Sequence, residues 1–329
     1  MAQNQERKSK TEEEKKTKNS SGNSETKEKK SKDKKDEKSS VNFDLDKIKD
    51  LINLITSEKD LNKLRHFFYS HINKIIKRHE ISKDYLILFL YDENNSINEK
   101  MTDKIYAAIP ENNDKPILLI LQSIGGQIEP AYLISKTCKE KSSKFSVVVP
   151  RRAKSAATLI SLGADEIHMG SMSELGPIDP QFGKLPALGL SSSLESIARV
   201  VSDYPKSSEM FAKYLGAQLD LRVLGYFERV SESAKQYAHR LLEGKKTPKN
   251  ISEISYALVY EYKDHNFVID KEEAKNHLGD IIKTNTKEYQ LANDIHKFMS
   301  DLNWLAGIVR KKNLEIVGNY ANFGITDIS

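Results

Sequence analysis

The chain has 329 residues and a formal net charge of +5, with 52 Lys and Arg against 47 Asp and Glu. This length allows one large domain with extensions. Most of the excess positive charge lies in residues 1–40, so the rest of the chain is close to neutral, which argues against a folded body that binds a specific nucleic acid. Cys138 is the single cysteine, which excludes an intrachain disulfide.

Residues 1–40 differ in composition from everything that follows. They are almost entirely Lys, Glu, Ser, Thr and Asn. A segment with so few apolar side chains cannot bury enough surface to offset the entropy of ordering it, so we expect a disordered tail that keeps the chain in solution. The alternative is a tail that touches polyanions non-specifically. The tail has no apolar signal-peptide stretch, and no run in the chain reaches the ~18 apolar residues of a membrane span. We therefore expect a cytoplasmic protein that does not insert into membranes.

Helical and strand patterns alternate through the next part of the chain. Residues 41–82 are predicted to form a helical front segment, in which apolar side chains recur with helical spacing from 44 to 77. A candidate first strand covers 84–91, a helix covers 96–109, and strands and helices then alternate as far as 169. This alternation predicts the α/β class, with mostly parallel strands joined by right-handed crossovers.

The pattern changes after Gln181. Residues 183–193 are rich in Gly, Pro and Ser, and we expect a loop over a cleft. Helices are then predicted at 193–201, 209–214, 218–243, 251–262 and 271–277, and a short strand at 281–282. The last part, residues 285–329, is predicted to be an extension in which 289–304 is helical.

Two consecutive βα units carry the most informative pattern. The first, PILLILQSIGGQIEPAYLISKTCK, has a buried strand at 117–121 that is followed by Gly125 and Gly126. The second, FSVVVPRRAKSAATLISLGADEIHM, has a strand at 146–149 and then Ser155 among small residues where a new helix begins. A serine at a strand-to-helix turn beside a Gly-Gly turn is an arrangement suited to a nucleophile next to an oxyanion hole. The alternatives are that Ser155 only caps the helix and that the glycines form an ordinary βα turn.

Four segments in this order resemble a known family. They are SIGGQIEPAYLI, AKSAATLISLGADEIHM, ELGPIDPQ and, more weakly, DHNFVIDKEEAKNHLGDII. The pattern resembles the serine dehydrogenase proteinase family of the Clp-protease/crotonase superfamily, which is related to signal peptide peptidase A. The resemblance implies that residues 83–284 form a Clp/crotonase-like peptidase domain, a layered stack of mostly parallel βαβ units.

The same resemblance implies roles for individual residues. Ser155 corresponds to the nucleophile, and Ala156 with the Gly125-Gly126 turn corresponds to the oxyanion hole; Gly125 is slightly preferred over Gly126. A glycine is needed there because a side chain would block the substrate carbonyl.

The general base is harder to assign from the sequence. The Clp subunit has a histidine after the strand that follows the serine helix, and an aspartate further on. Here those two places hold Asp179 and His265, so the acid and the base are exchanged, which is the order of the serine dehydrogenase proteinase family. The alternatives are a turn role for Asp179, a simple loop position for His265, and His168 or Lys184 as the base; a lysine base would require burial.

The resemblance, together with these residues, implies an ATP-independent serine peptidase that acts on peptides or unfolded proteins through an acyl-enzyme. No cofactor is implied, and the sequence has no metal-ligand spacing. The superfamily resemblance implies a homo-oligomer. Two other functions stay open: a crotonase-like acyl-CoA enzyme, for which we find no adenine-recognition feature, and a non-catalytic scaffold of the same fold.

Overall fold

The computed structural model describes residues 43–182, 185–218 and 220–328. The predicted tail, residues 1–40, lies outside the described residues, and so does Lys184. Residues from Phe43 onward form one compact unit. No helix in the described part of the chain is both long enough and apolar enough to cross a membrane.

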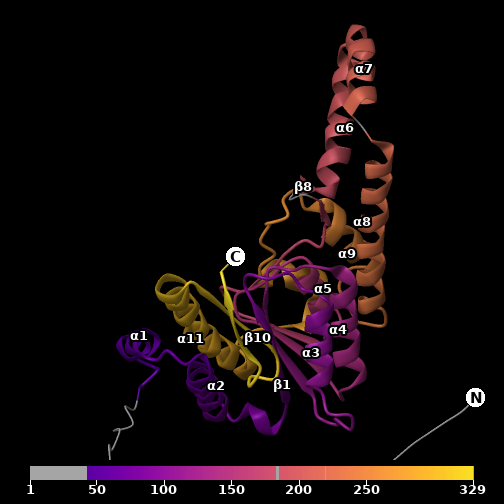
Figure 1. Ribbon diagram of the computed structural model, residues 1–329. Helices are drawn as coiled ribbons and strands as arrows, with labels where there is room; N and C mark the ends of the chain where they lie inside the picture. The colour runs from indigo at the N-terminus through magenta and orange to yellow at the C-terminus, as the bar shows by residue number, and fades with distance from the viewer. Residues whose placement is uncertain (1–42, 183–184, 219, 329) are drawn as a thin grey trace, which may run out of the picture. The chain divides into compact units, whose positions relative to one another are not determined.

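A central sheet organises this unit (Figure 1). Its main strands are β1 (Leu86–Asp92), β2 (Ile117–Ser123), β3 (Phe145–Val149), β5 (Glu166–Met169), β9 (Ile282–Lys283), β10 (Lys312–Gly318) and β11 (Phe323–Asp327). The strand order is β11-β10-β1-β2-β3-β5-β9. The strands from β1 to β9 in this order are parallel, whereas β10 and β11 are antiparallel to their neighbours. The predicted α/β class with a mostly parallel sheet is therefore confirmed.

Two layers of helices cover the two faces of this sheet. One layer contains α3 (Glu99–Ala107), α4 (Ile128–Glu140) and α5 (Ala156–Leu162), and the other contains α1 (Ile48–Ser57), α2 (Leu61–Arg78) and α11 (Lys287–Arg310). Side chains alternate along a strand, so Leu88 and Leu90 of β1 pack in the first layer while Phe89 and Tyr91 pack in the second. Because both faces of the sheet are buried, its strands are near-continuous apolar runs in the sequence.

The front segment, predicted to be helical from 44 to 77, forms two helices, α1 and α2. The chain leaves the helical conformation after α1, and the Asp60 side chain accepts a hydrogen bond of 2.8 Å from the Asn62 N–H at the start of α2. An aspartate in this place satisfies a backbone donor that the first helical turn leaves unpaired. Both helices pack with α11 on the same face of the sheet.

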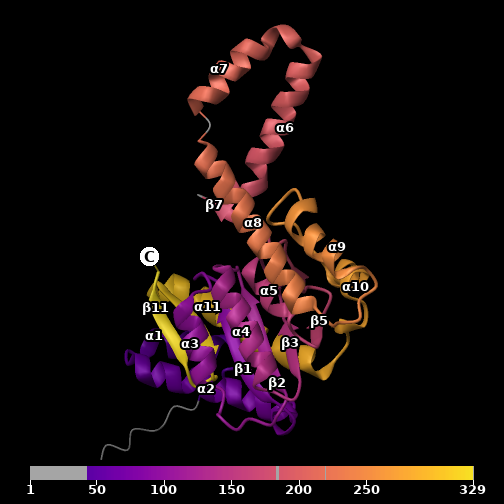
Figure 2. The same ribbon diagram turned by 90° about the vertical axis from the view of Figure 1, so that its right-hand side faces the viewer.

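The predicted loop at 183–193 is wrong for its second half. Helix α6 begins at Ala187 and runs to Asp203, and it is followed by α7 (Ser208–Gln218) and α8 (Leu221–Leu242). Gly189 costs a helix only about 1 kcal/mol, which tertiary packing can offset. That packing is provided by α8, which lies beside α6 (Figure 2).

The C-terminal segment completes the sheet. The helix predicted at 289–304 is present as the longer α11, and the β10–β11 hairpin that follows extends the sheet beside β1. The short strand β4 (Arg152–Ala153) comes just before α5. Further short elements lie between α5 and α11: β6 (Glu174–Leu175), β7 (Gln181–Phe182), β8 (Leu185–Pro186), α9 (Ile251–Tyr256), a π-helical turn (Ala257–Glu261) and α10 (Lys271–Leu278).

Candidate active site

Ser155 occupies a strained backbone position between β4 and α5. Its φ is 51° and its ψ is −118°, a left-handed region that a residue with a Cβ rarely adopts. Helix α5 follows at once, and all seven of its residues are buried. The Ser155 side chain makes no capping hydrogen bond to this helix. The simple capping role that the sequence left open is therefore not what the hydroxyl does.

Gly125 lies so close to Ser155 that no side chain fits. Its φ is 101°, and a Cβ added there would lie 2.7 Å from the Lys154 carbonyl oxygen, 2.8 Å from Ser155 Cβ and 3.3 Å from the Ala156 nitrogen. A glycine is therefore required by the conformation and by the approach of the two turns. The turn after β2 and the turn before α5 lie side by side, as the two βα units suggested.

The amide groups of this turn point in different directions. The Gly125 N–H donates to Ser123 Oγ at 3.2 Å. A parallel bridge to Ile97 uses the Gly125 carbonyl and the Gln127 N–H, so the N–H of Gly126 points away from Ile97. The first N–H groups of a helix have no intrahelical partner, and Ala156 provides such a group next to Ser155.

Asp179 and His265 form a hydrogen-bonded pair across 86 positions of the chain. The distance from His265 Nδ1 to Asp179 Oδ1 is 2.7 Å. Asp179 is only 2% exposed, and its second oxygen accepts from Gln181 Nε2 at 2.9 Å. Because an ionised carboxylate can only accept, the pair favours the tautomer with a proton on Nδ1, which leaves Nε2 as an acceptor.

Ser155 and His265 line the same cleft, with a volume of about 670 Å³. Gly125, Gly126 and Ile178 also line it. The opposite wall comes from α8, through Tyr226, Arg229, Val230 and Ser233. Sequence patterns alone do not indicate this wall, because α8 follows Ser155 by more than 60 residues and has the pattern of an ordinary amphipathic helix.

A model of the ClpP-like SDH-type serine proteinases matches residues 45–293 of the sequence. The chain belongs to this family. The match includes every residue singled out above and most of the sheet.

Two curated relatives of this family member are uncharacterized proteins of Methanocaldococcus jannaschii. One is 31% identical over 175 residues, which is 53% of this chain and 56% of the relative. The other is 28% identical over 180 residues, with 54% and 56% covered. The match therefore spans about half the length of these relatives.

Solved structures of two kinds are also similar to this ClpP-like chain. A serine-to-alanine variant of the 1510-N membrane-bound stomatin-specific protease has a TM-score of 0.39 and 14% identity, covering 74% of this chain and 94% of that one. ClpP1 from Listeria monocytogenes has a TM-score of 0.37 and 16% identity, covering 65% and 99%.

The other basic residues considered from the sequence lie in different settings. His168 is on β5 between Ile167 and Met169, which face the α5 layer, so His168 faces the opposite side of the sheet. Its Nδ1 lies 3.0 Å from Thr286 Oγ1, and burial lowers the pKa of His168 despite the nearby carboxylates of Glu288 and Glu166. Lys184 lies outside the described residues. Within the described ranges, no group of three His, Cys, Asp or Glu side chains is arranged to hold a metal ion.

Proposed function

We propose that this chain is a serine peptidase that hydrolyses peptide bonds without ATP, through an acyl-enzyme on Ser155. The cleft carries this proposal, because one wall combines a strained serine, a glycine that touches it and a histidine held by a buried aspartate. Membership of the ClpP-like SDH-type family supports the same activity.

His265 acts as the general base in this proposal. Its Nε2 takes the proton of the Ser155 hydroxyl while Oγ attacks the carbonyl carbon of the scissile peptide bond. Asp179 keeps the proton on Nδ1 and stabilises the imidazolium that forms. The imidazolium then gives its proton to the leaving amine, the C–N bond breaks, and a water molecule, deprotonated by His265, hydrolyses the ester on Ser155.

The N–H groups of Gly126 and Ala156 bind the oxyanion in this proposal. Gly126 lines the cleft, and the Ala156 N–H directly follows Ser155 at the start of α5. Gly125 has a steric role: a methyl group there would lie 3.3 Å from the Ala156 nitrogen and would cover the donor. Fixed donors of this kind stabilise the developing negative charge at no cost of reorganisation. The sequence alone slightly preferred Gly125 as the donor, but its N–H already donates to Ser123 Oγ.

The Asp179–His265 pair separates this proposal from its alternatives. A crotonase-like acyl-CoA enzyme and a non-catalytic scaffold both use the fold, but neither requires a histidine oriented by a buried carboxylate beside a strained serine.

Labelling with a fluorophosphonate probe tests the proposal. The wild-type protein should form a covalent adduct, and peptide mapping should locate it on Ser155. Ser155→Ala should give no adduct and no hydrolysis of a fluorogenic peptide library. Thr158→Ser is a matched control, because Thr158 is a buried hydroxyl on α5 whose Oγ1 donates to the Ala153 carbonyl, so labelling should persist. If the probe does not label the wild-type protein, the peptidase proposal is wrong, and the acyl-CoA enzyme and the non-catalytic scaffold are left as the candidate functions.

A homo-oligomer is part of the proposal. Large apolar side chains are exposed from α6 to α7. They are Val200 on α6, Tyr204 between α6 and the 3-10 turn η2 (Pro205–Ser207), and Met210 and Tyr214 on α7. Exposed apolar clusters of this kind favour association between copies of a chain. Light scattering coupled to gel filtration should give a mass above that of the 37.4 kDa monomer.

A further inference from the structure

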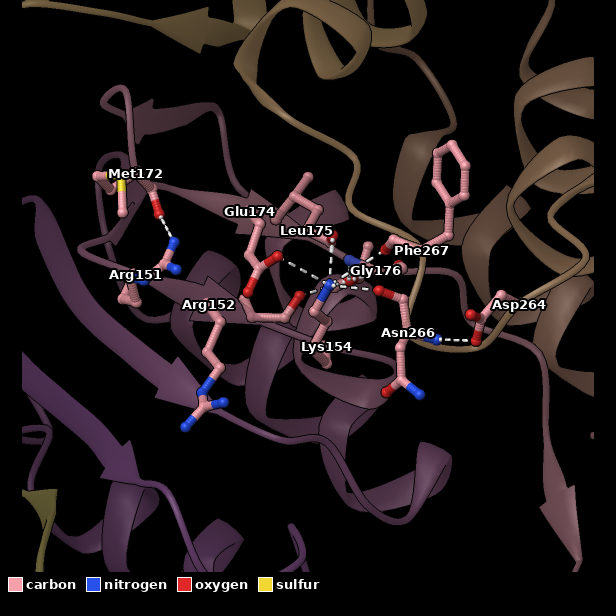
Figure 3. A network of polar contacts seen from close by, with 12 residues as sticks. Arg151, Arg152, Lys154, Met172, Glu174, Leu175, Gly176, Asp264, Asn266 and Phe267 are labelled. Carbon is pink, nitrogen blue, oxygen red and sulfur yellow. Dashed lines mark hydrogen bonds and ion pairs between the residues drawn. The ribbon is translucent and has the colours of Figure 1, made fainter. Parts of the chain in front are cut away.

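Lys154 precedes Ser155 in the sequence, but it is not among the residues that line the cleft. Figure 3 shows it directed between two neighbouring segments of the chain. Its Nζ lies 3.2 Å from Glu174 Oε2, and both side chains are only 14% exposed. The ammonium group is therefore mostly buried and forms an ion pair with Glu174, so it is not free to act as a base for Ser155.

The same ammonium group donates to the loop that carries His265. Its Nζ lies 3.4 Å from the Asn266 carbonyl oxygen and 3.1 Å from the Phe267 carbonyl oxygen (Figure 3). These carbonyls belong to the two residues directly after His265. An ammonium group has three N–H donors, which suits it to bind several acceptors from one position.

The backbone of Lys154 is fixed at the nucleophile turn. Its N–H donates to the Ser123 carbonyl at 3.0 Å, and its carbonyl accepts from the Ala157 N–H at 2.9 Å. One residue thus connects the end of β2, the start of α5 and the loop after His265. Gly176 makes this path possible, because a Cβ at that position would lie 2.6 Å from Lys154 Cδ.

Besides the bond between His265 and Asp179, the loop is held by local turn bonds and by a ring contact of Phe267 with Tyr262, whose ring centroids are 4.9 Å apart. The Asn266 N–H donates to Asp264 Oδ1 at 2.9 Å, which shapes the turn locally. The nearest ladder contact is the bridge between Leu175 and Ile269, four residues beyond His265. The two carbonyls that Lys154 binds are nearer to His265 in the sequence than Ile269 is.

We propose that Lys154 is a positioning residue that holds the His265 loop at a fixed distance from the Ser155 turn. The inference rests on the proposed peptidase function. Lys154 acts through the loop backbone and does not touch substrate. Without its ammonium group the loop samples other positions, and His265 is aligned with Ser155 for a smaller fraction of the time.

The test compares Lys154→Met with Arg151→Met. Methionine keeps most of the apolar stem beside Gly176 but removes the donors. Arg151 is the matched control, because its guanidinium binds the Met172 carbonyl on another loop (Figure 3). Two quantities are measured on the full chain: amide hydrogen exchange of residues 263–268, and the second-order rate of fluorophosphonate labelling of Ser155.

Lys154→Met should speed amide hydrogen exchange in residues 263–268 and leave exchange in α5 unchanged. It should also slow fluorophosphonate labelling of Ser155 about 10- to 100-fold, because a misplacement of about 1 Å can cost about 10²-fold in rate. Arg151→Met should change neither quantity. If Lys154→Met does not fold, the double variant Lys154→Met/Glu174→Gln leaves no unpaired carboxylate and should give the same two effects.

Three results overturn the inference: unchanged exchange in the loop, exchange that rises equally throughout the chain, or a labelling rate within about two-fold of wild type. In each of these cases a labelled wild-type protein leaves the peptidase proposal intact. A wild-type protein that the probe does not label removes the peptidase proposal and this inference together.

Discussion

Asp179→Asn should lower the rate of peptide hydrolysis by about 10²- to 10⁴-fold while the protein stays folded. The change replaces one oxygen by an amide nitrogen and keeps the shape of the side chain. In the wild-type protein the buried carboxylate accepts from His265 Nδ1 at 2.7 Å and from Gln181 Nε2 at 2.9 Å. Asparagine offers only one acceptor oxygen, so it cannot serve both donors.

The size of the loss depends on which way the new amide faces. If its nitrogen faces His265, the imidazole must accept on Nδ1 and carry its proton on Nε2, so it cannot take the proton of Ser155. If its oxygen faces His265, the tautomer is correct, but the imidazolium loses its negative partner. The first orientation accounts for the upper end of the range and the second for the lower end.

Gln181 allows the two orientations to be separated. In Asp179→Asn/Gln181→Glu, the glutamate offers an acceptor to the asparagine nitrogen, which turns the asparagine oxygen toward His265. This double variant should recover about ten-fold of the lost activity. Gln181→Ala is the control, and it should stay within about three-fold of wild type because it leaves the His265 contact in place.

The assay is kcat/KM for a fluorogenic peptide selected with the wild-type protein. His265→Ala should be less active than Asp179→Asn, because the asparagine variant still contains the base. Adding Ser155→Ala to His265→Ala should cause little further loss, since residues that act as one unit are strongly non-additive. The assignment is refuted if Asp179→Asn retains a third or more of wild-type activity, or if His265→Ala hydrolyses the peptide at a near-normal rate.

Three further outcomes are expected. Ser155→Ala should abolish hydrolysis yet change the free energy of unfolding by less than about 1 kcal/mol, measured with urea, because no capping hydrogen bond is lost; retained turnover above a few per cent would exclude Ser155 as the nucleophile. Gly125→Ala should cost at least 1–2 kcal/mol in stability for its positive φ and about 10²-fold or more in labelling rate, because the methyl group would crowd Ala156; a stable and fully reactive variant would contradict the geometry. Burial raises the pKa of Asp92 to about 6 from 3.8, so Asp92 favours the folded state most at low pH and this contribution is lost as the pH rises from ~4 to ~6. The free energy of unfolding of wild type relative to Asp92→Asn should fall by about 2–3 kcal/mol over that interval, and a constant difference would show that Asp92 does not titrate there.

The sequence predicted secondary structure correctly where local patterns determine it. Strands buried on both faces are continuous apolar runs, so β1, β2 and β3 were predicted close to their observed bounds. The turn that carries Ser155 was also predicted, since glycine stands at position 125, where a side chain does not fit, and small residues flank Ser155. Propensity failed at Gly189, where α6, which contacts α8, continues through a segment with the composition of a loop.

The residues of the candidate site also fall into two groups: those that the sequence indicated and those that only the tertiary structure brought together. Ser155, Gly125 and Gly126 could be singled out from the sequence because each belongs to a turn that short-range chemistry specifies. Whether Asp179 meets His265 could not be read from it, because the two residues are 86 positions apart and each fits an ordinary turn or loop. The α8 wall of the cleft and the contact of Lys154 with the His265 loop likewise depend on distant segments packing together. Local residue preferences thus determined the strands and the turn that carries Ser155, whereas long-range packing, which no short pattern encodes, brought Asp179 to His265, placed His265 in the cleft with Ser155, and set Lys154 against the His265 loop.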